Sequence, residues 1–192
     1  MSRAATLLSS ARRYRGVSGR ELARRTASSQ AGLVGVENGS ADATTERLDR
    51  ILRTLGYQVI TIPTRLGTAA DAAEEARHFL AAGNADAAFR VALQLVADLT
   101  RADEALRVAL CVTPPALTGD PRFDALIAGI VDWELSKDAL PIPQWVREDT
   151  RVLSEPWDVE PVPTLRESAR RRTPEAFRRH GVYLAASELV DA

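Results

Sequence analysis

The chain has few of the residue types from which metal and nucleophile centres are built. Its 192 residues include one cysteine, Cys111, and two histidines, His78 and His180. A single cysteine cannot form a disulfide within the chain, and the apolar neighbours of Cys111 indicate a buried thiol in a reducing compartment. The histidines and the cysteine lack the spacing of a zinc site. We therefore expect no metal and no other cofactor.

Enzyme motifs are lacking as well. The sequence contains no glycine-rich phosphate loop and no serine nucleophile motif. Asp71, Glu74 and Glu75 lie close together, but acidic side chains in the first turn of a helix are favoured by the helix dipole. They need no catalytic explanation. We expect that the protein is not an enzyme.

Long apolar runs are absent, and aromatic residues make up only 5% of the chain. The first ten residues lack the apolar core of a secretory signal, and no stretch approaches the roughly 20 apolar residues of a membrane helix. The apolar residues are mainly Ala, Leu and Val, which favour helix over sheet. We predict an all-α, cytoplasmic protein that does not contact a membrane.

The net charge of −1 conceals an asymmetry. Residues 1–65 contain eleven arginines and five acidic residues, a net charge of +6, so the remainder carries −7. A basic module on an acidic body is typical of a chain that binds phosphates with one part and a partner with the other. A chance imbalance on a solvated surface is the alternative. We predict two domains, residues 1–65 and 66–192.

The first domain has the pattern of short helices. Ser18 and Ser29 each precede a short helical segment, and serine is a favoured N-cap residue. A further helix opens at Thr44 and is closed by Gly56. We predict a bundle of five helices here. Residues 57–62 alternate like a short β-strand, which could pair with its copy in a second subunit or pack as an extended arm.

These segments resemble the Cro/C1-type (XRE-family) helix-turn-helix transcriptional regulators over about residues 4–62. The residues that carry the resemblance are Ser18, Glu21-Leu22-Ala23, Ser29-Gln30, Leu33, Val36-Glu37-Asn38-Gly39 and Leu55-Gly56-Tyr57. The resemblance implies a repressor that binds double-stranded operator DNA as a homodimer on a pseudo-palindrome. A helix-turn-helix retained for dimerisation or partner contact is the alternative.

The resemblance also implies roles for single residues. Gln30 would read base edges, since a Gln amide can bond adenine bidentately. Asn38 would donate to phosphate, and Arg12 and Glu37 would form an internal ion pair. The implied DNA-binding set is Ser18, Gly19, Arg20, Ser29, Gln30, Ala31, Gly32, Gly35 and Asn38.

The chain departs from the family at several of these positions. Gly19 stands where the family usually has a glutamine that clamps phosphate, and Ser28 stands where an apolar turn residue is usual. Gly32 and Gly35 each cost roughly 1 kcal/mol of helix stability relative to Ala. The predicted recognition helix is therefore poor in reading groups, and arginines could supply phosphate contacts instead. These arginines are Arg13, Arg15 and Arg20.

The second domain is predicted to be helical, with a proline-rich segment over residues 141–163 that wraps its own domain or a partner. Helices are predicted over residues 70–82, 85–102 and 103–112, and another is predicted to begin just after Pro121. In the tail, we expect Thr173 to cap a short helix that has Pro174 at its first position. Residues 182–184 are expected to be extended.

Parts of this second half resemble bacterial antitoxin-like regulators paired with nucleotidyltransferase-type toxins, over residues 143–157 and 173–184. The resemblance implies an autorepressor that neutralises a protein toxin through its C-terminal domain. The implied partner-binding residues are Trp145, Trp157, Arg170, Arg171, Arg172, Phe177, Arg178, Arg179 and Tyr183. Three alternatives remain: a solvated basic tail, a repressor that senses a small ligand, and a helix-turn-helix head on an enzyme.

Overall fold

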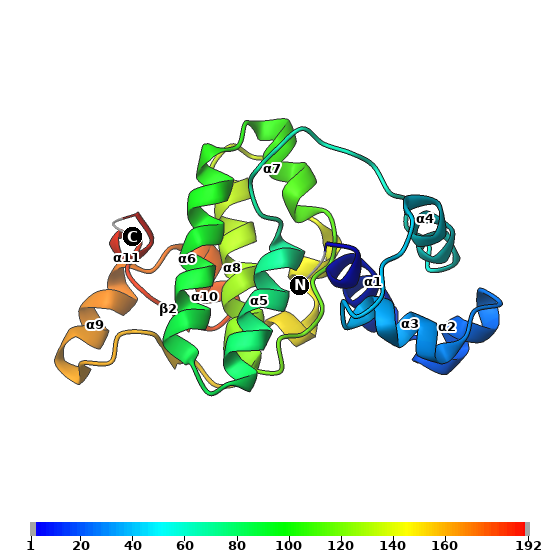
Figure 1. Ribbon diagram of the computed structural model, residues 1–192. Helices are drawn as coiled ribbons and strands as arrows, with labels where there is room; N and C mark the ends of the chain where they lie inside the picture. The colour runs from blue at the N-terminus through cyan, green and yellow to red at the C-terminus, as the bar shows by residue number, and fades with distance from the viewer. Residues whose placement is uncertain (1–2, 191–192) are drawn as a thin grey trace.

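The computed structural model describes residues 3–190, and this part of the chain is mostly helical, as the composition predicts (Figure 1). Four helices form an N-terminal unit, which we call the head. They are α1 (Arg3–Tyr14), α2 (Gly19–Arg25), α3 (Gln30–Glu37) and α4 (Thr45–Thr54). The head has four helices within the described residues, not the predicted five. Gly56, with a φ of +80°, ends the helical run, and an extended connector follows.

The remaining elements form a second unit, which we call the body. Its central layer consists of α5 (Ala69–Ala81), α6 (Ala85–Arg101), α7 (Glu104–Cys111) and α8 (Pro121–Ser136). Helix α8 lies in the middle and is almost wholly buried. The C-terminal elements are the 3₁₀ turns η1 (Gln144–Arg147) and η2 (Asp149–Arg151), β1 (Trp157–Asp158), α9 (Pro163–Arg172), α10 (Glu175–Arg179), β2 (Val182–Tyr183) and α11 (Ser187–Val190).

Each unit has its own buried apolar cluster. The head cluster includes Leu8, Leu22, Leu33, Val36 and Ile51, which come from all four helices. The body cluster surrounds α8 and extends to Leu189. Figure 1 shows α1 between the rest of the head and α5, with the other head helices projecting to the right.

The segment predicted as a short strand, residues 57–62, is extended but has no partner strand among the described residues. This stretch pairs with no other described segment, although Tyr57 and Val59 pack on the head cluster. Ile60 is 68% exposed. The alternating pattern correctly indicated extended backbone, the packing of Tyr57 and Val59 fits the predicted extended arm, and pairing with a second copy stays a prediction.

A small parallel sheet forms elsewhere. Trp157 pairs with Val182 and Asp158 pairs with Tyr183, so the all-α prediction is incomplete. Val182 was expected to be extended. Its partner strand was not predicted, because the surrounding prolines and the short length of Trp157–Asp158 hide it.

The proline-rich segment covers the body of its own chain. Trp145 is 1% exposed, and its indole Nε1 donates to the carbonyl oxygen of Cys111 at 2.9 Å. The predicted cap at Thr173 is wrong, because the Thr173 hydroxyl donates backwards to the carbonyl of Ala169 at 2.9 Å. It thereby closes the end of α9 instead of opening α10.

No helix in the described part of the chain is long and apolar enough to cross a membrane. Within the same residues, no group of three or more His, Cys, Asp and Glu side chains is arranged to hold a metal ion.

Candidate nucleic-acid interface and partner surface

Helices α2 and α3 are joined by a tight turn and capped as the sequence predicts. Ser18 Oγ accepts from the backbone N–H of Glu21 at 3.1 Å, and Ser29 Oγ accepts from that of Gly32 at 3.1 Å. Both caps satisfy a donor that would otherwise be left open at a helix start. The buried side chains of Leu22 and Leu33 then fix the two helices in the head cluster.

An ion pair ties the first helix of the head to the end of the third. Arg12 Nε and Nη2 donate to the two carboxylate oxygens of Glu37, each at 2.6 Å. The hydrogen bonds that Arg12 donates to this carboxylate raise the pKa of its guanidinium. The pairing predicted for these two residues is therefore present. It holds α3 at a fixed angle to α1, and neither side chain is free to contact a ligand.

The exposed face of α3 is a narrow stripe. It consists of Gln30, Val34 and the C-cap Asn38, which follow the i, i+4, i+8 spacing of one helix face, and of Ala31 beside Gln30; all four are exposed. Val34 is 41% exposed although it is apolar. The sequence prediction included three of these four and missed Val34. The i+4 spacing from Gln30 could have identified it.

Two glycines of α3 do not lie on this stripe. A Cβ at Gly32 would lie 2.9 Å from Ser29 Oγ and 3.3 Å from Arg47 Nη2, and a Cβ at Gly35 would lie 3.1 Å from Ala41 Cβ. Both glycines therefore permit close packing within the head. This packing explains why α3 contains two residues that would weaken an isolated helix. Their predicted place on the groove-facing surface is not supported by this geometry.

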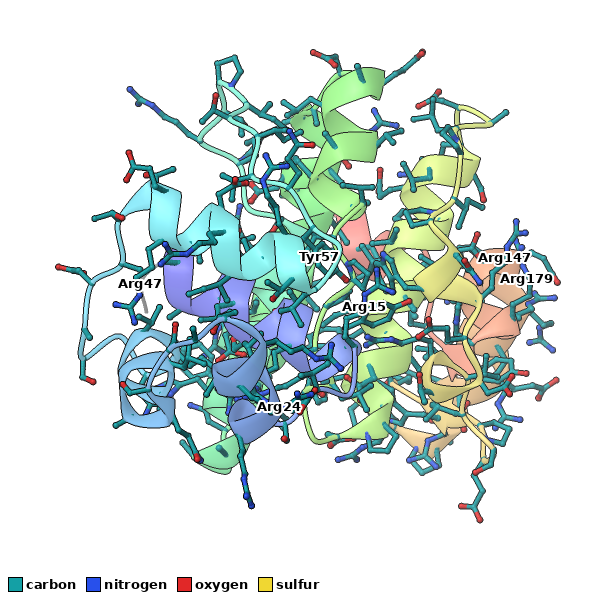
Figure 2. The ribbon with its side chains drawn as sticks, turned by 90° about the vertical axis from the view of Figure 1, so that its right-hand side faces the viewer. Arg15, Arg24, Arg47, Tyr57, Arg147 and Arg179 are labelled. Carbon is teal, nitrogen blue, oxygen red and sulfur yellow. The ribbon has the colours of Figure 1, made fainter. Side chains whose placement is uncertain are left out.

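Several arginines of the head have no acidic partner in the described residues. Arg20 on α2 and Arg50 on α4 are exposed and form no ion pair there, and Gly19 has open space around it. Arg47 from α4 reaches toward the first turn of α3 (Figure 2). The sequence prediction missed Arg47 and Arg50, because their placement depends on the tertiary packing of α4, which contacts α1.

Other arginines of the head are already engaged. Arg24 and Arg25 both donate to Glu21 and hold the pKa of that carboxyl at about 2. Arg13 lies 3.6 Å from Glu74 of the body. Arg15 donates to the carbonyl of Leu55 at 3.0 Å and lies over the ring of Tyr57 (Figure 2). Of the three arginines expected to contact DNA phosphate, Arg13 and Arg15 lie against the body and the connector, and Arg20 makes no such contact in the described residues.

The predicted partner-binding residues fall into two groups. Trp145 and Phe177 are 1% and 0% exposed, so they are core residues and cannot meet a partner in this fold. Trp157 is half-buried against Phe123, with ring centroids 5.8 Å apart. Tyr183 is half-buried in β2 beneath the guanidinium of Arg170. Large aromatic residues among prolines are compatible with either a core or an interface. In this structure Trp145 and Phe177 belong to the core.

The second group consists of exposed arginines on and near α9, which protrudes from the body (Figure 1). Arg170 makes a bidentate pair with Asp158, and Arg171 pairs with Glu167 along the helix. Arg178 donates to the carbonyls that end α9, and Arg179 lies 3.5 Å from Asp132. Arg172 contacts only Ser168. Local contacts thus hold these arginines at one end of the body.

No family model, curated protein or solved structure matches the chain.

Proposed function

We propose that the protein is a sequence-specific DNA-binding regulator of the helix-turn-helix class, in which α3 enters the major groove. The observation that carries the proposal is the exposed stripe of Gln30, Ala31, Val34 and Asn38 on α3. Gln30 can pair bidentately with adenine, and Ala31 and Val34 can contact a thymine methyl group. Arg20, Arg47 and Arg50 supply positive charge near this stripe for the phosphate backbone.

A two-stage binding experiment tests this proposal. The full chain is first used to select duplexes from a random pool, and its affinity for the selected site is then measured as a function of salt. Arg20→Gln should weaken binding to all duplexes and reduce the salt slope by about 1. Arg90→Gln is the matched control, since Arg90 is exposed and unpaired among the described residues but lies on α6 of the body. Equal losses in both variants, or no enriched site, would overturn the proposal.

We further propose that a second copy of this chain pairs with the connector to form the homodimer. The backbone of residues 60–63 makes no hydrogen bond with another described residue, and Ile60 and Ile62 are 68% and 37% exposed. An extended segment with free backbone groups and exposed β-branched side chains is suited to strand pairing. Ile60→Asp should shift the protein from dimer to monomer in light scattering after gel filtration. A wild-type monomer at micromolar concentration contradicts this part.

A second candidate function concerns the other end of the molecule. We propose that α9 docks on an acidic surface of a protein partner, and the resemblance of the second half implies a nucleotidyltransferase-type toxin. Leu165 is 51% exposed and Val162 is 45% exposed next to the arginines, so α9 offers apolar and cationic contacts together. With such a partner, the chain would be an antitoxin and autorepressor.

Charge reversal is the sharpest test of this candidate. Deletion of residues 164–192 would remove Phe177, Val182 and Leu184 from the body cluster and so confuse binding with unfolding. The double variant Arg171→Glu and Arg172→Glu changes only exposed side chains. Co-expressed with the product of the neighbouring reading frame, it should fail to form the complex, while Arg90→Glu should form it. Retention of the complex by the double variant would overturn the α9 assignment.

A further inference from the structure

A cavity of about 520 Å³ lies where the end of α1 meets the body. Its walls include Arg13, Tyr14 and Arg15 from the head and Glu148 and Arg151 from the body. Neither the DNA-binding stripe on α3 nor the arginines of α9 form part of it. Volumes of this size are typical of small-molecule sites.

The most unusual group in this wall is Arg151. Its side chain is 2% exposed, yet Nε and Nη1 have no hydrogen-bond acceptor among the described residues. Only Nη2 donates, to the carbonyl of Pro115, and the nearest carboxylate oxygen, on Asp124, is 3.6 Å from Nη1. Buried donors are almost always satisfied in folded proteins. Arg151 therefore carries a buried positive charge in this wall that makes one hydrogen bond and one ion pair, with Asp124, among the described residues.

The other charged groups around the cavity leave cationic charge available. Arg13 forms its ion pair with Glu74, which is not part of the cavity lining. Arg77 already donates hydrogen bonds to the Glu74 carboxylate, so the charge of Arg13 is only partly compensated. Arg15 has no acidic partner in the described range. Among the described residues that line the cavity, Glu148 is the acidic one, and it accepts a hydrogen bond from the Tyr14 hydroxyl at 2.5 Å.

We propose that this cavity binds a small phosphorylated molecule, held by Arg13 and Arg15 from the head and attracted by the charge of Arg151 from the body. Arginine forks match the geometry of phosphate oxygens. Burial lowers the pKa of the Arg151 guanidinium more than the nearby Asp124 and Glu148 raise it, so a further anion in the cavity would stabilise this charge. Because the arginines come from both units, the bound molecule would link head to body. The proposal is independent of DNA binding.

Calorimetric titration of the full chain tests the site with three probes: inorganic phosphate, adenosine monophosphate and glucose 6-phosphate. Arg15→Gln should weaken binding about tenfold or more, as expected for the loss of a hydrogen bond to a charged group. Glu148→Gln should tighten binding, since it removes the acidic side chain that lines the cavity while leaving an acceptor for Tyr14. Equal affinity for the three probes would assign the recognition to the phosphate alone, and tighter binding of the nucleotide would assign it to a nucleoside phosphate.

The control is Arg147→Gln, an identical change of charge next to Glu148 on an exposed side chain outside the cavity wall (Figure 2). It should leave all three affinities unchanged. The test avoids Arg151 variants, because loss of this side chain would leave the buried Asp124 carboxylate without its ion-pair partner and unfold the body. The inference is overturned if no probe binds the wild-type chain, if Arg147→Gln weakens binding as much as Arg15→Gln, or if Glu148→Gln fails to tighten it.

Discussion

The ring of Phe177 lies against the backbone of Gly129, so closely that a Cβ on Gly129 would be 2.7 Å from Cδ1 of the ring. This contact seats α10 on the central helix α8. Gly129→Ala should destabilise the protein by roughly 1–3 kcal/mol through overpacking, which outweighs the gain in helix propensity of up to about 1 kcal/mol. Urea unfolding measures the difference.

The matched control for this exchange is Gly19→Ala, since nothing lies within 4 Å of a Cβ at that helix start. It should cause no loss of stability. If both exchanges have the same effect, Phe177 does not constrain Gly129.

The Arg12–Glu37 pair should contribute to stability. Glu37→Gln removes the charge from a bidentate pair whose side chains are 18% and 10% exposed. We expect the free energy of unfolding to fall by about 1–2 kcal/mol. This is at the low end for charge-assisted hydrogen bonds, because Arg12 is partly solvated. Asp42→Asn is the control, an exposed acid without a partner among residues 3–190, and should leave the urea midpoint unchanged.

The sequence predicts structure correctly where the interacting residues lie within a few positions of each other. Ser18 and Ser29 cap donors three residues away, so their role could be inferred without tertiary information. Trp145 and Phe177 were assigned to a partner surface because their chemistry suits an interface as well as a core. Only the fold decides between the two, since Trp145 meets Cys111 and Phe177 meets α8 across long stretches of sequence.

The same limit applies to the candidate sites. The exposed position of Gln30 could be predicted from its place at the start of a capped helix, and its base-reading role stays a prediction from the resemblance. The cavity at the head–body junction could not be predicted, because Tyr14 and Glu148 are brought together only by the packing of α1 on the body. The glycines of α3 were interpreted as a weakness. The structure gives them a packing role against Ser29 and Ala41.

Gln30→Ala should reduce discrimination rather than overall affinity. Loss of one bidentate base contact costs roughly 1–3 kcal/mol at the specific site. The affinity for random duplex DNA should stay unchanged, because non-specific affinity comes from phosphate contacts. Competition titrations with the selected site and random DNA measure both. Gln94→Ala, on the exposed face of α6, is the control. Unaltered discrimination in Gln30→Ala would remove its base-reading role.

The Cys111 thiol should be unreactive in the folded protein. Burial raises its pKa to about 12, so it is protonated at pH 8 and does not attack disulfide reagents. One equivalent should react rapidly in urea and very slowly without it. Fast labelling of the native protein at pH 8 would show that the thiol is accessible.

Stability should decline in alkaline solution. Burial raises the pKa of Cys111 to about 12 from an ordinary value of 9.0, so the contribution of the protonated thiol is complete below pH 9. It is lost as the pH rises toward 12, because the unfolded chain then releases the proton more readily. Unfolding of Cys111→Ala should depend less on pH over this range. Equal slopes for both proteins would contradict the assignment.

Helix α1 belongs to both units: its apolar side chains enter the head cluster, while Arg13 and Tyr14 contact Glu74 and Glu148 of the body. The connector that joins the units covalently carries exposed side chains, Arg65 among them. A protease that cuts after Arg65 would therefore break the backbone without releasing the head. The two fragments would migrate together in a native gel and separate only in denaturant. Fragment size on a denaturing gel would thus misrepresent how the units are held together.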